Sequence, residues 1–285
     1  MSSSRQRNDH PARFSPRLDK EGKGRRDQCF RSGGGDGGDW VWGRHAVAAA
    51  LANPARAPFK RLLVTTEGLK ALQAEKGARA AIEASGLVPE TMTNGGDISH
   101  VLPPGAVHQG LALSAAALEP VDLESVAEPA HGLLLMLDQV TDPQNVGAIF
   151  RSAAAFGARA VILQDRHAPP FTGALAKAAA GAIDQVPSVR VVNLARALEQ
   201  LGELGWRSVG LAGEAGTPLA EALDGTPTVL VLGSEGEGLR RLVGEHCDVL
   251  ANIPMPGGFE SLNVASAAAI ALYEGARARV PGERD

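Results

Sequence analysis

The second half of the chain alternates between short apolar runs and amphipathic stretches, and this alternation restricts the fold more than any other feature. The first run, Leu133–Leu137, is apolar at every position, as expected for a strand buried on both faces. Strands that alternate with helices predict an α/β fold, here a mostly parallel sheet with helices on both faces. We expect strands at 133–137, 160–163, 188–192, 208–212, 228–232 and 249–253, and helices at 146–156, 174–182, 194–204, 239–244 and 262–278.

The sequence before this region predicts a smaller α/β unit and a connecting segment. Residues 40–115 contain short apolar strands and a helical stretch at 69–84, whereas 116–129 is rich in proline and carries no periodic pattern. The predicted organisation is therefore a small domain at 40–115, a linker at 116–129 and a larger domain at 130–285.

Residues 1–39 are polar and end in a run of glycines, so they bury too little apolar surface to offset the entropy of ordering. We predict that this tail is disordered. Gly33, Gly35 and Gly38 match the spacing GxGxxG, but no strand precedes them and no helix follows, so they do not indicate a dinucleotide site. The tail carries nine Lys and Arg against six Asp and Glu, whereas the rest of the chain carries 19 against 26.

The composition excludes several classes of protein. Two cysteines, Cys29 and Cys247, are too few for a disulfide framework or a Cys-rich zinc module. No apolar run is long enough to span a membrane, and the polar amino terminus lacks the apolar core of a signal peptide. We therefore expect a cytoplasmic protein without a metal site. The net charge of −4 argues against a surface coated by nucleic acid, so contacts with RNA must come from local patches or the tail.

Ligands of open α/β sheets bind beyond the carboxyl ends of the strands, so the loops after the strands are the candidate sites. The first is the loop of residues 138–151. Asn145 lies where we expect a helix to start and is placed to cap it, and Arg151 is the only charged residue between Asp142 and Arg159. Taken alone, this loop is better explained by an asparagine cap and a solvated arginine than by a functional site.

The second candidate loop is rich in glycine and spans residues 232–239. Its glycines permit positive φ angles and a close approach of the backbone to a ligand. It is not a phosphate-binding loop of the Walker type, and Glu235 and Glu237 disfavour a phosphate at the next helix start. A ligand that carries positive charge suits it better, and a plain tight turn is the alternative.

The third candidate loop, residues 253–266, is rich in proline and glycine and leads directly into a helix. Ser261 and Asn263 are placed to cap that helix, which is dominated by small residues and can therefore be approached closely. A simple packing helix is the alternative for this segment.

Taken together, the three loops resemble the three motifs of the SPOUT superfamily, and more narrowly those of the TrmH-type RNA ribose 2′-O-methyltransferases. The motifs are Asn145-x-Gly-Ala-x-x-Arg151, Leu232-Gly-Ser-Glu-Gly-x-Gly-Leu239 and Ile253-Pro-Met followed by Ser261-Leu-Asn-Val-Ala-Ser266. Residues 42–47 and 108–110 resemble the two ends of the small L30e-like domain found in this family. Residues 177–182 and 191–194 resemble the branch that modifies guanosine in bacterial 23S rRNA, although Asp184 stands where we expect glutamate.

The resemblance implies a trefoil knot in the larger domain, S-adenosylmethionine bound in a bent form at the knot, and a homodimer formed through this domain. The implied catalytic residues are Asn145, Arg151, Glu235, Ser261 and Asn263. The implied cofactor-binding residues are Leu211, Ala212, Gly213, Gly233, Ser234, Glu235, Gly236, Ile253, Pro254, Met255, Ser261 and Leu262.

Methyl transfer to a ribose 2′-oxygen requires alignment of the reactants and loss of the hydroxyl proton. Because arginine is effectively always protonated, we expect Arg151 to stabilise the developing alkoxide or to orient a phosphate. Glu235 then accepts the proton or pairs with Arg151. The candidate RNA contacts are Arg44, His45, Lys60 and Arg61 in the small domain, each of which also fits a solvated surface charge.

Three alternatives remain at this point. A non-catalytic RNA-binding relative is disfavoured because the four motif residues Asn145, Arg151, Glu235 and Asn263 are all present. A dinucleotide-dependent oxidoreductase is disfavoured because no GxGxxG follows the first long apolar strand. A tRNA-directed enzyme of the same fold differs in substrate, and the presence of the small domain favours rRNA, since the tRNA branch of the family typically lacks that domain.

Overall fold

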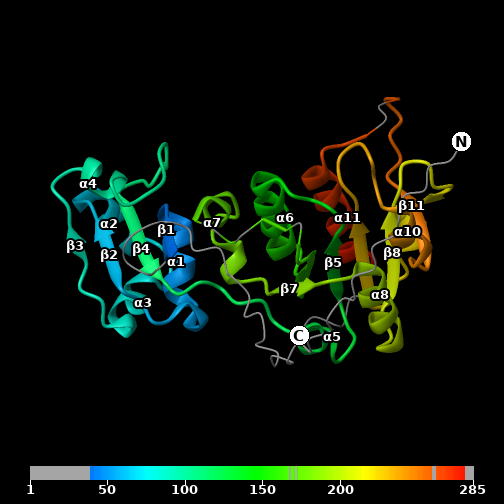
Figure 1. The fold of residues 1–285 in the computed structure, drawn as a ribbon, viewed down its shortest axis with the longest axis horizontal. Helices are drawn as coiled ribbons and strands as arrows, with labels where there is room; N and C mark the ends of the chain where they lie inside the picture. The colour runs from blue at the N-terminus through cyan, green and yellow to red at the C-terminus, as the bar shows by residue number, and fades with distance from the viewer. Residues whose placement is uncertain (1–38, 167, 170, 172, 259–260, 280–285) are drawn as a thin grey trace, which may run out of the picture. The chain divides into compact units, whose positions relative to one another are not determined.

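The computed structural model describes residues 39–166, 168, 169, 171, 173–258 and 261–279. Within these residues the strands form two sheets, one of four strands and one of seven (Figure 1). Residues 1–38 of the predicted disordered tail, with its glycine run and Cys29, lie outside the described residues, whereas Asp39 begins the first strand. No helix in the described part of the chain is long and apolar enough to cross a membrane.

The four-stranded sheet is formed by the segment that the sequence predicts to be the small domain. Its strand order is β1-β4-β2-β3, with β1 and β2 both antiparallel to β4 and with β3 parallel to β2. The strands are β1 Asp39–Trp42, β2 Arg61–Val64, β3 Glu90–Thr91 and β4 Leu111–Ala115. The helices around them are α1 Arg44–Ala52, η1 Pro54–Arg56, α2 Thr66–Gln73, α3 Ala78–Ser85 and α4 Gly95–Ser99.

The seven-stranded sheet confirms the predicted fold class, because all of its strand pairs are parallel. Its order is β7-β6-β5-β10-β8-β11-β9. The strands are β5 Leu133–Leu137, β6 Ala160–Gln164, β7 Ser188–Val191, β8 Arg207–Leu211, β9 Thr217–Pro218, β10 Thr228–Leu232 and β11 Val249–Asn252. The sequence did not predict β9, since it has two residues and one of them is proline.

Helices cover both faces of this sheet, and the alternation of side chains along β5 shows how. Leu133, Leu135 and Leu137 belong to the core that contains α6, α7, α9 and α11, whereas Leu134 and Met136 belong to the core that contains α5, α8 and α10. These helices are α5 Leu123–Ala127, α6 Pro143–Ala155, α7 Gly173–Ala178, α8 Leu194–Glu203, α9 Leu219–Ala222, α10 Arg241–Glu245 and α11 Val264–Ala278. In Figure 1, α6 and α11 lie side by side on their face of the sheet.

Two of the predicted helices are interrupted by residues with left-handed backbone conformation. The predicted helix at 69–84 is α2 followed by α3, with Gly77 between them at φ 79°. The predicted helix at 174–182 ends early because Ala180 and Gly181 have positive φ, and a short 3-10 helix, η2 Ala182–Asp184, follows. Both predictions were wrong in extent, because apolar spacing continues across a break in which the backbone leaves the helix.

The predicted linker is partly packed against the larger sheet. Its helix α5 contributes Leu123 and Val126 to the core on one face, and the indole nitrogen of Trp206 donates a 2.8 Å hydrogen bond to the carbonyl of Ala127. The domain boundaries, the knot and the L30e-like character of the four-stranded sheet remain predictions.

A buried ion pair joins η1 to η2. The Arg56 Nε donates to Asp184 Oδ1 at 2.7 Å, and the two side chains are 1% and 0% exposed. Asn53 Nδ2 donates to the same carboxylate oxygen, and Arg56 Nη1 donates to the carbonyl of Ala116. The Asp184 carboxylate, which stands where the resemblance predicts glutamate, therefore lies in a buried network, and glutamate would have to place one more methylene there.

We predict that Asp184→Asn lowers the free energy of unfolding by about 3–5 kcal/mol, because it leaves the buried Arg56 guanidinium without a charged partner. Urea unfolding followed by circular dichroism measures this change. Glu67→Gln is the matched control, since it removes the same charge from an exposed pair with Lys70 that contributes little. An equal loss in both variants would show that the buried network does not stabilise the fold.

Candidate functional site

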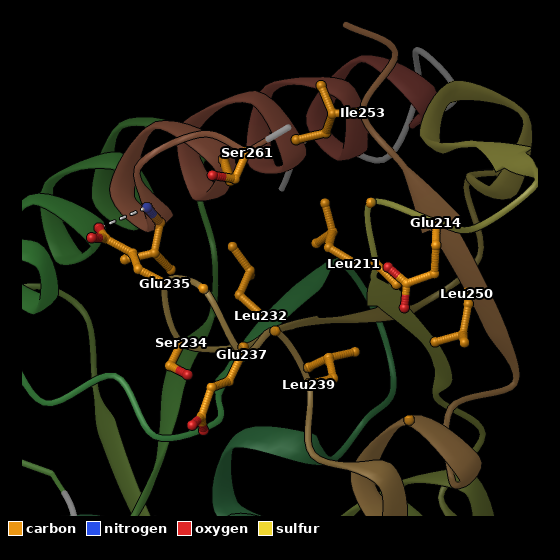
Figure 2. Close-up of a pocket in the computed structure, with 18 of the residues that line it drawn as sticks. Leu211, Glu214, Leu232, Ser234, Glu235, Glu237, Leu239, Leu250, Ile253 and Ser261 are labelled. Carbon is orange, nitrogen blue, oxygen red and sulfur yellow. Dashed lines mark hydrogen bonds between the residues drawn. The ribbon is translucent and has the colours of Figure 1, made fainter. Parts of the chain in front are cut away.

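A cavity of about 660 Å³ lies at the carboxyl ends of β8, β10 and β11. Its walls are Leu211–Glu214 after β8, the loop Gly233–Leu239 after β10, and Ile253, Met255, Ser261 and Leu262 after β11. Figure 2 shows Glu235 at one end of the cavity and Glu214 at the other. The cavity therefore forms where the parallel arrangement of the sheet predicts a ligand site.

The structure brings the predicted cofactor-binding residues together. Every one of them except Pro254 lines this cavity. The two neighbours of that proline, Ile253 and Met255, do line it. The role of these residues in binding a cofactor remains a prediction.

The glycine-rich loop depends on glycine at its neck. Gly238 N donates to the carbonyl of Ser234 at 3.1 Å, and these two residues form an antiparallel bridge. A Cβ atom on Gly233 would lie 2.0 Å from the backbone of Gly238, and Gly236 and Gly238 have positive φ. The backbone thus closes on itself and turns Ser234–Glu237 toward the cavity.

Three polar side chains from the three predicted motifs meet beside the cavity. Glu235 Oε1 accepts hydrogen bonds from Asn263 Nδ2 at 2.6 Å, from Asn145 Nδ2 at 3.1 Å and from the backbone amide of Val264 at 3.3 Å. These three bonds converge on one oxygen of Glu235. Asn263 Nδ2 also donates to Asn145 Oδ1 at 3.0 Å, which links the two amides directly.

The caps of α6 and α11 explain why the side-chain amides of Asn145 and Asn263 are free to bond Glu235. Asp142, and not Asn145, caps α6, since its carboxylate accepts from the amides of Gln144 and Asn145. The prediction that Asn145 is a cap was therefore wrong, because the helix begins at Pro143, a favoured first helical residue. Asn263 does cap α11 through its Oδ1, which leaves its Nδ2 to face Glu235.

The structure does not contain the predicted pair between Arg151 and Glu235. The two motif residues Asn145 and Arg151 are six residues apart, so on α6 they project about 120° apart around the axis. Arg151 is exposed, and its side chain makes no hydrogen bond or ion pair with the described residues. Ser261 lines the cavity but does not take part in the hydrogen bonds of Glu235.

The predicted RNA contacts lie in the small sheet and its helices, in a part of the chain that is remote in sequence from Asn145, Glu235 and Asn263. Arg44 and His45 both contact Glu75, at 2.7 and 3.4 Å. Arg61 forms a two-pronged pair with Glu90, whose hydrogen bonds to the guanidinium lower the pKa of the Glu90 carboxyl. Lys60 is exposed. Both arginines and the histidine therefore have a carboxylate partner within the chain.

Sequence reasoning missed several residues of the cavity. Glu214 lines it after β8, and Arg240 and Arg241 line it next to the glycine-rich loop. Glu214 could have been found, because it directly follows Gly213 after a predicted strand. Arg240 had no such signal, since its partners lie far away in the sequence.

The cavity lining fits a ligand that combines an apolar ring system with positive charge, as S-adenosylmethionine does. Apolar side chains such as Leu211, Leu232 and Ile253 point into it, and the carboxylate of Glu214 lies at its edge (Figure 2). In the described part of the chain no cluster of three or more His, Cys, Asp or Glu side chains is placed to hold a metal.

Comparison with known proteins agrees with these motifs. The model of the SpoU rRNA Methylase family matches residues 132–273. The 23S rRNA (guanosine-2′-O-)-methyltransferase RlmB of Xylella fastidiosa is 42% identical over 249 residues, which cover 84% of this chain and 96% of that protein. The chain belongs to the SpoU rRNA methylase family.

Solved structures of this family share the fold. The SpoU methyltransferase AviRb from Streptomyces viridochromogenes superposes with a TM-score of 0.69 at 26% identity, over 86% of this chain and 91% of that chain. An AdoMet-bound rRNA methyltransferase from Sinorhizobium meliloti superposes with a TM-score of 0.68 at 26% identity, over 84% and 87%. These structures confirm the α/β fold that the alternating pattern predicts.

We predict that Gly233→Ala weakens binding of S-adenosylmethionine at least tenfold, because the added Cβ would collide with the Gly238 backbone and open the loop. Isothermal titration calorimetry measures the affinity. Gly216→Ala is the control, since a Cβ at Gly216 meets nothing within 4 Å. Unchanged affinity in Gly233→Ala would mean that the cofactor does not depend on this loop.

Burial raises the pKa of the Cys247 thiol to about 12, with smaller contributions from Asp248 and Asp138. Because the thiolate is the reactive form, we predict that Cys247 resists iodoacetamide at pH 8 in the folded protein and reacts in urea. Mass spectrometry of the Cys29→Ser variant measures alkylation of Cys247 alone.

The same pKa shift makes stability depend on pH. The contribution of the neutral Cys247 thiol to the free energy of unfolding is fully present below the unfolded pKa of about 8.5 and is lost as the pH rises toward 12.

Proposed function

We propose that this chain transfers a methyl group from S-adenosylmethionine to the ribose 2′-oxygen of a guanosine in 23S rRNA. The observation that carries the proposal is the convergence of Asn145, Glu235 and Asn263, one from each motif, beside a cavity lined by the predicted cofactor residues. The 42% identity to the 23S rRNA enzyme over nearly its whole length supports the same substrate class.

The cofactor, when bound, supplies an electrophilic methyl group on a sulfonium. The chain supplies orientation and a proton acceptor. Because the three hydrogen bonds to Glu235 all go to Oε1, its Oε2 remains available to a ribose hydroxyl. Asn145 and Asn263 hold the carboxylate in one orientation, which is the condition for efficient general-base catalysis.

Arg151 has a different role in this proposal. Since it makes no hydrogen bond or ion pair with Glu235 and is exposed, we assign it to a phosphate next to the target ribose, which a guanidinium binds through two parallel hydrogen bonds. Alternatively, Arg151 pairs with a residue of a second copy of the chain. The exposed side chains of Ile270 and Tyr273 on the neighbouring helix α11 support a homodimer through this face.

We assign the small domain to RNA recognition. Arg44 and Arg61 keep 43% and 40% of their side-chain surface exposed in spite of their ion pairs, and they can exchange a carboxylate for a phosphate. Lys60 and His45 are exposed as well. Such contacts make affinity fall with salt concentration.

Transfer of tritium from labelled S-adenosylmethionine to 23S rRNA and to bulk tRNA tests the proposal, with nuclease mapping of the labelled ribose. We expect label on one guanosine 2′-oxygen of 23S rRNA. Label on tRNA alone would show that the substrate is tRNA and not 23S rRNA. Binding of the cofactor without any transfer to free RNA or to ribosomal particles would identify a non-catalytic relative.

We predict that Glu235→Gln lowers kcat at least a hundredfold, since the amide cannot accept the ribose proton. Single-turnover transfer to 23S rRNA measures this loss. The exposed Glu221→Gln makes the same chemical change on α9 and serves as the control. Near-normal turnover in Glu235→Gln would exclude it as the base.

Arg151→Lys is expected to raise KM for RNA more than it lowers kcat, because lysine keeps the charge but not the planar fork. Steady-state transfer at varied concentrations of 23S rRNA separates the two constants. A fall in kcat with unchanged KM would instead assign Arg151 to the chemical step.

A further inference from the structure

A buried carboxylate at the end of the central strand β5 contacts the glycine-rich loop at both of its ends. Asp138 is 0% exposed. Its backbone amide donates to the carbonyl of Leu232, directly before the loop, at 2.8 Å. Its carboxylate accepts from the backbone amide of Arg240, directly after the loop, at 2.9 Å. One residue thus closes the base of the segment 233–239.

The side chain of Arg240 strengthens this closure. Its Nε donates to Asp138 Oδ1 at 2.7 Å, and its Nη2 donates to the side-chain oxygen of Gln164 at the end of β6 at 3.0 Å. The guanidinium therefore bridges from the loop to two neighbouring strands. Hydrogen bonds of this charged type are shorter and stronger than neutral ones.

Asp138 also begins the loop that leads to Asn145 on α6. The same residue consequently anchors two of the three segments that meet at Glu235, and the 3.1 Å bond between Asn145 and Glu235 joins the far ends of these segments. A shift of the loop base would separate the two side chains and would change the wall of the cavity, which includes Arg240 itself.

We propose that Asp138 is a positioning residue, which acts through Arg240 to hold the glycine-rich loop in the shape that binds cofactor and presents Glu235. This inference rests on the proposed function. A purely stabilising ion pair is the competing explanation, because breaking any buried pair destabilises a protein. The Arg56–Asp184 pair, equally buried on its acidic side and formed by residues that do not line the cavity, makes the two explanations separable.

The test compares Asp138→Asn with Asp184→Asn in the full chain. The amide introduced by Asp138→Asn would turn an N–H group toward a donor of Arg240, so we expect amides of residues 233–240 to exchange with deuterium at least tenfold faster. We also expect the Kd for S-adenosylmethionine, measured by calorimetry below both melting temperatures, to rise at least tenfold. In Asp184→Asn, the melting temperature should fall while loop exchange and Kd stay within twofold of wild type.

Arg240→Lys provides a graded variant. It keeps the backbone amide that donates to Asp138 and loses the fork, so its loop should exchange faster than wild type and more slowly than Asp138→Asn.

The inference is overturned if Asp138→Asn leaves loop exchange within twofold of wild type, or if Asp184→Asn loosens the loop and weakens binding as much. If the wild-type chain binds no S-adenosylmethionine, the proposed function fails. In that case, the rate of deuterium exchange in residues 233–240 alone decides whether Asp138 holds the loop.

Discussion

The burial of β5 and β10 on both faces is the constraint on which the rest of the structure depends. Each apolar side chain that these strands bury contributes roughly 1.5–3 kcal/mol, so their parallel register at the centre of the sheet is strongly determined. Parallel register places the ends of neighbouring strands at one edge. The polar loops that follow them meet there, and the site is therefore a consequence of how the core is built.

Two buried carboxylates in the described part of the chain connect segments that are far apart in the sequence. The side chains of Asp138 and Asp184 are both 0% exposed. Asp138 accepts from the backbone amide and the side chain of Arg240, and Asp184 accepts from the side chains of Arg56 and Asn53. Apolar residues of the same volume would stabilise the fold as well or better. What each carboxylate adds is orientation, because it bonds donors of a segment that is remote from it in the sequence.

The parts of the fold that sequence reasoning predicted are those that depend on local pattern. The apolar runs identified the six main strands, and the order of three loop motifs identified the residues around the cavity. Gly77 and Ala180 interrupt helices whose apolar spacing continues past them, so periodicity could not find those breaks. The pairing of Arg151 with Glu235 failed because residue type does not say which side of α6 a side chain occupies. The bond from Arg240 to Asp138 spans 102 residues and has no local signature.

The cap of α11 sets the polarity of the hydrogen bonds at the site. The first amides of this helix require an oxygen, so Asn263 turns Oδ1 toward them and Nδ2 outward. That outward nitrogen meets Asn145 Oδ1, which leaves the Asn145 nitrogen for Glu235. Neither amide can be rotated by half a turn without placing like atoms together. The start of α11 thereby decides which way the two side-chain amides point, and both direct a donor at the Glu235 carboxylate.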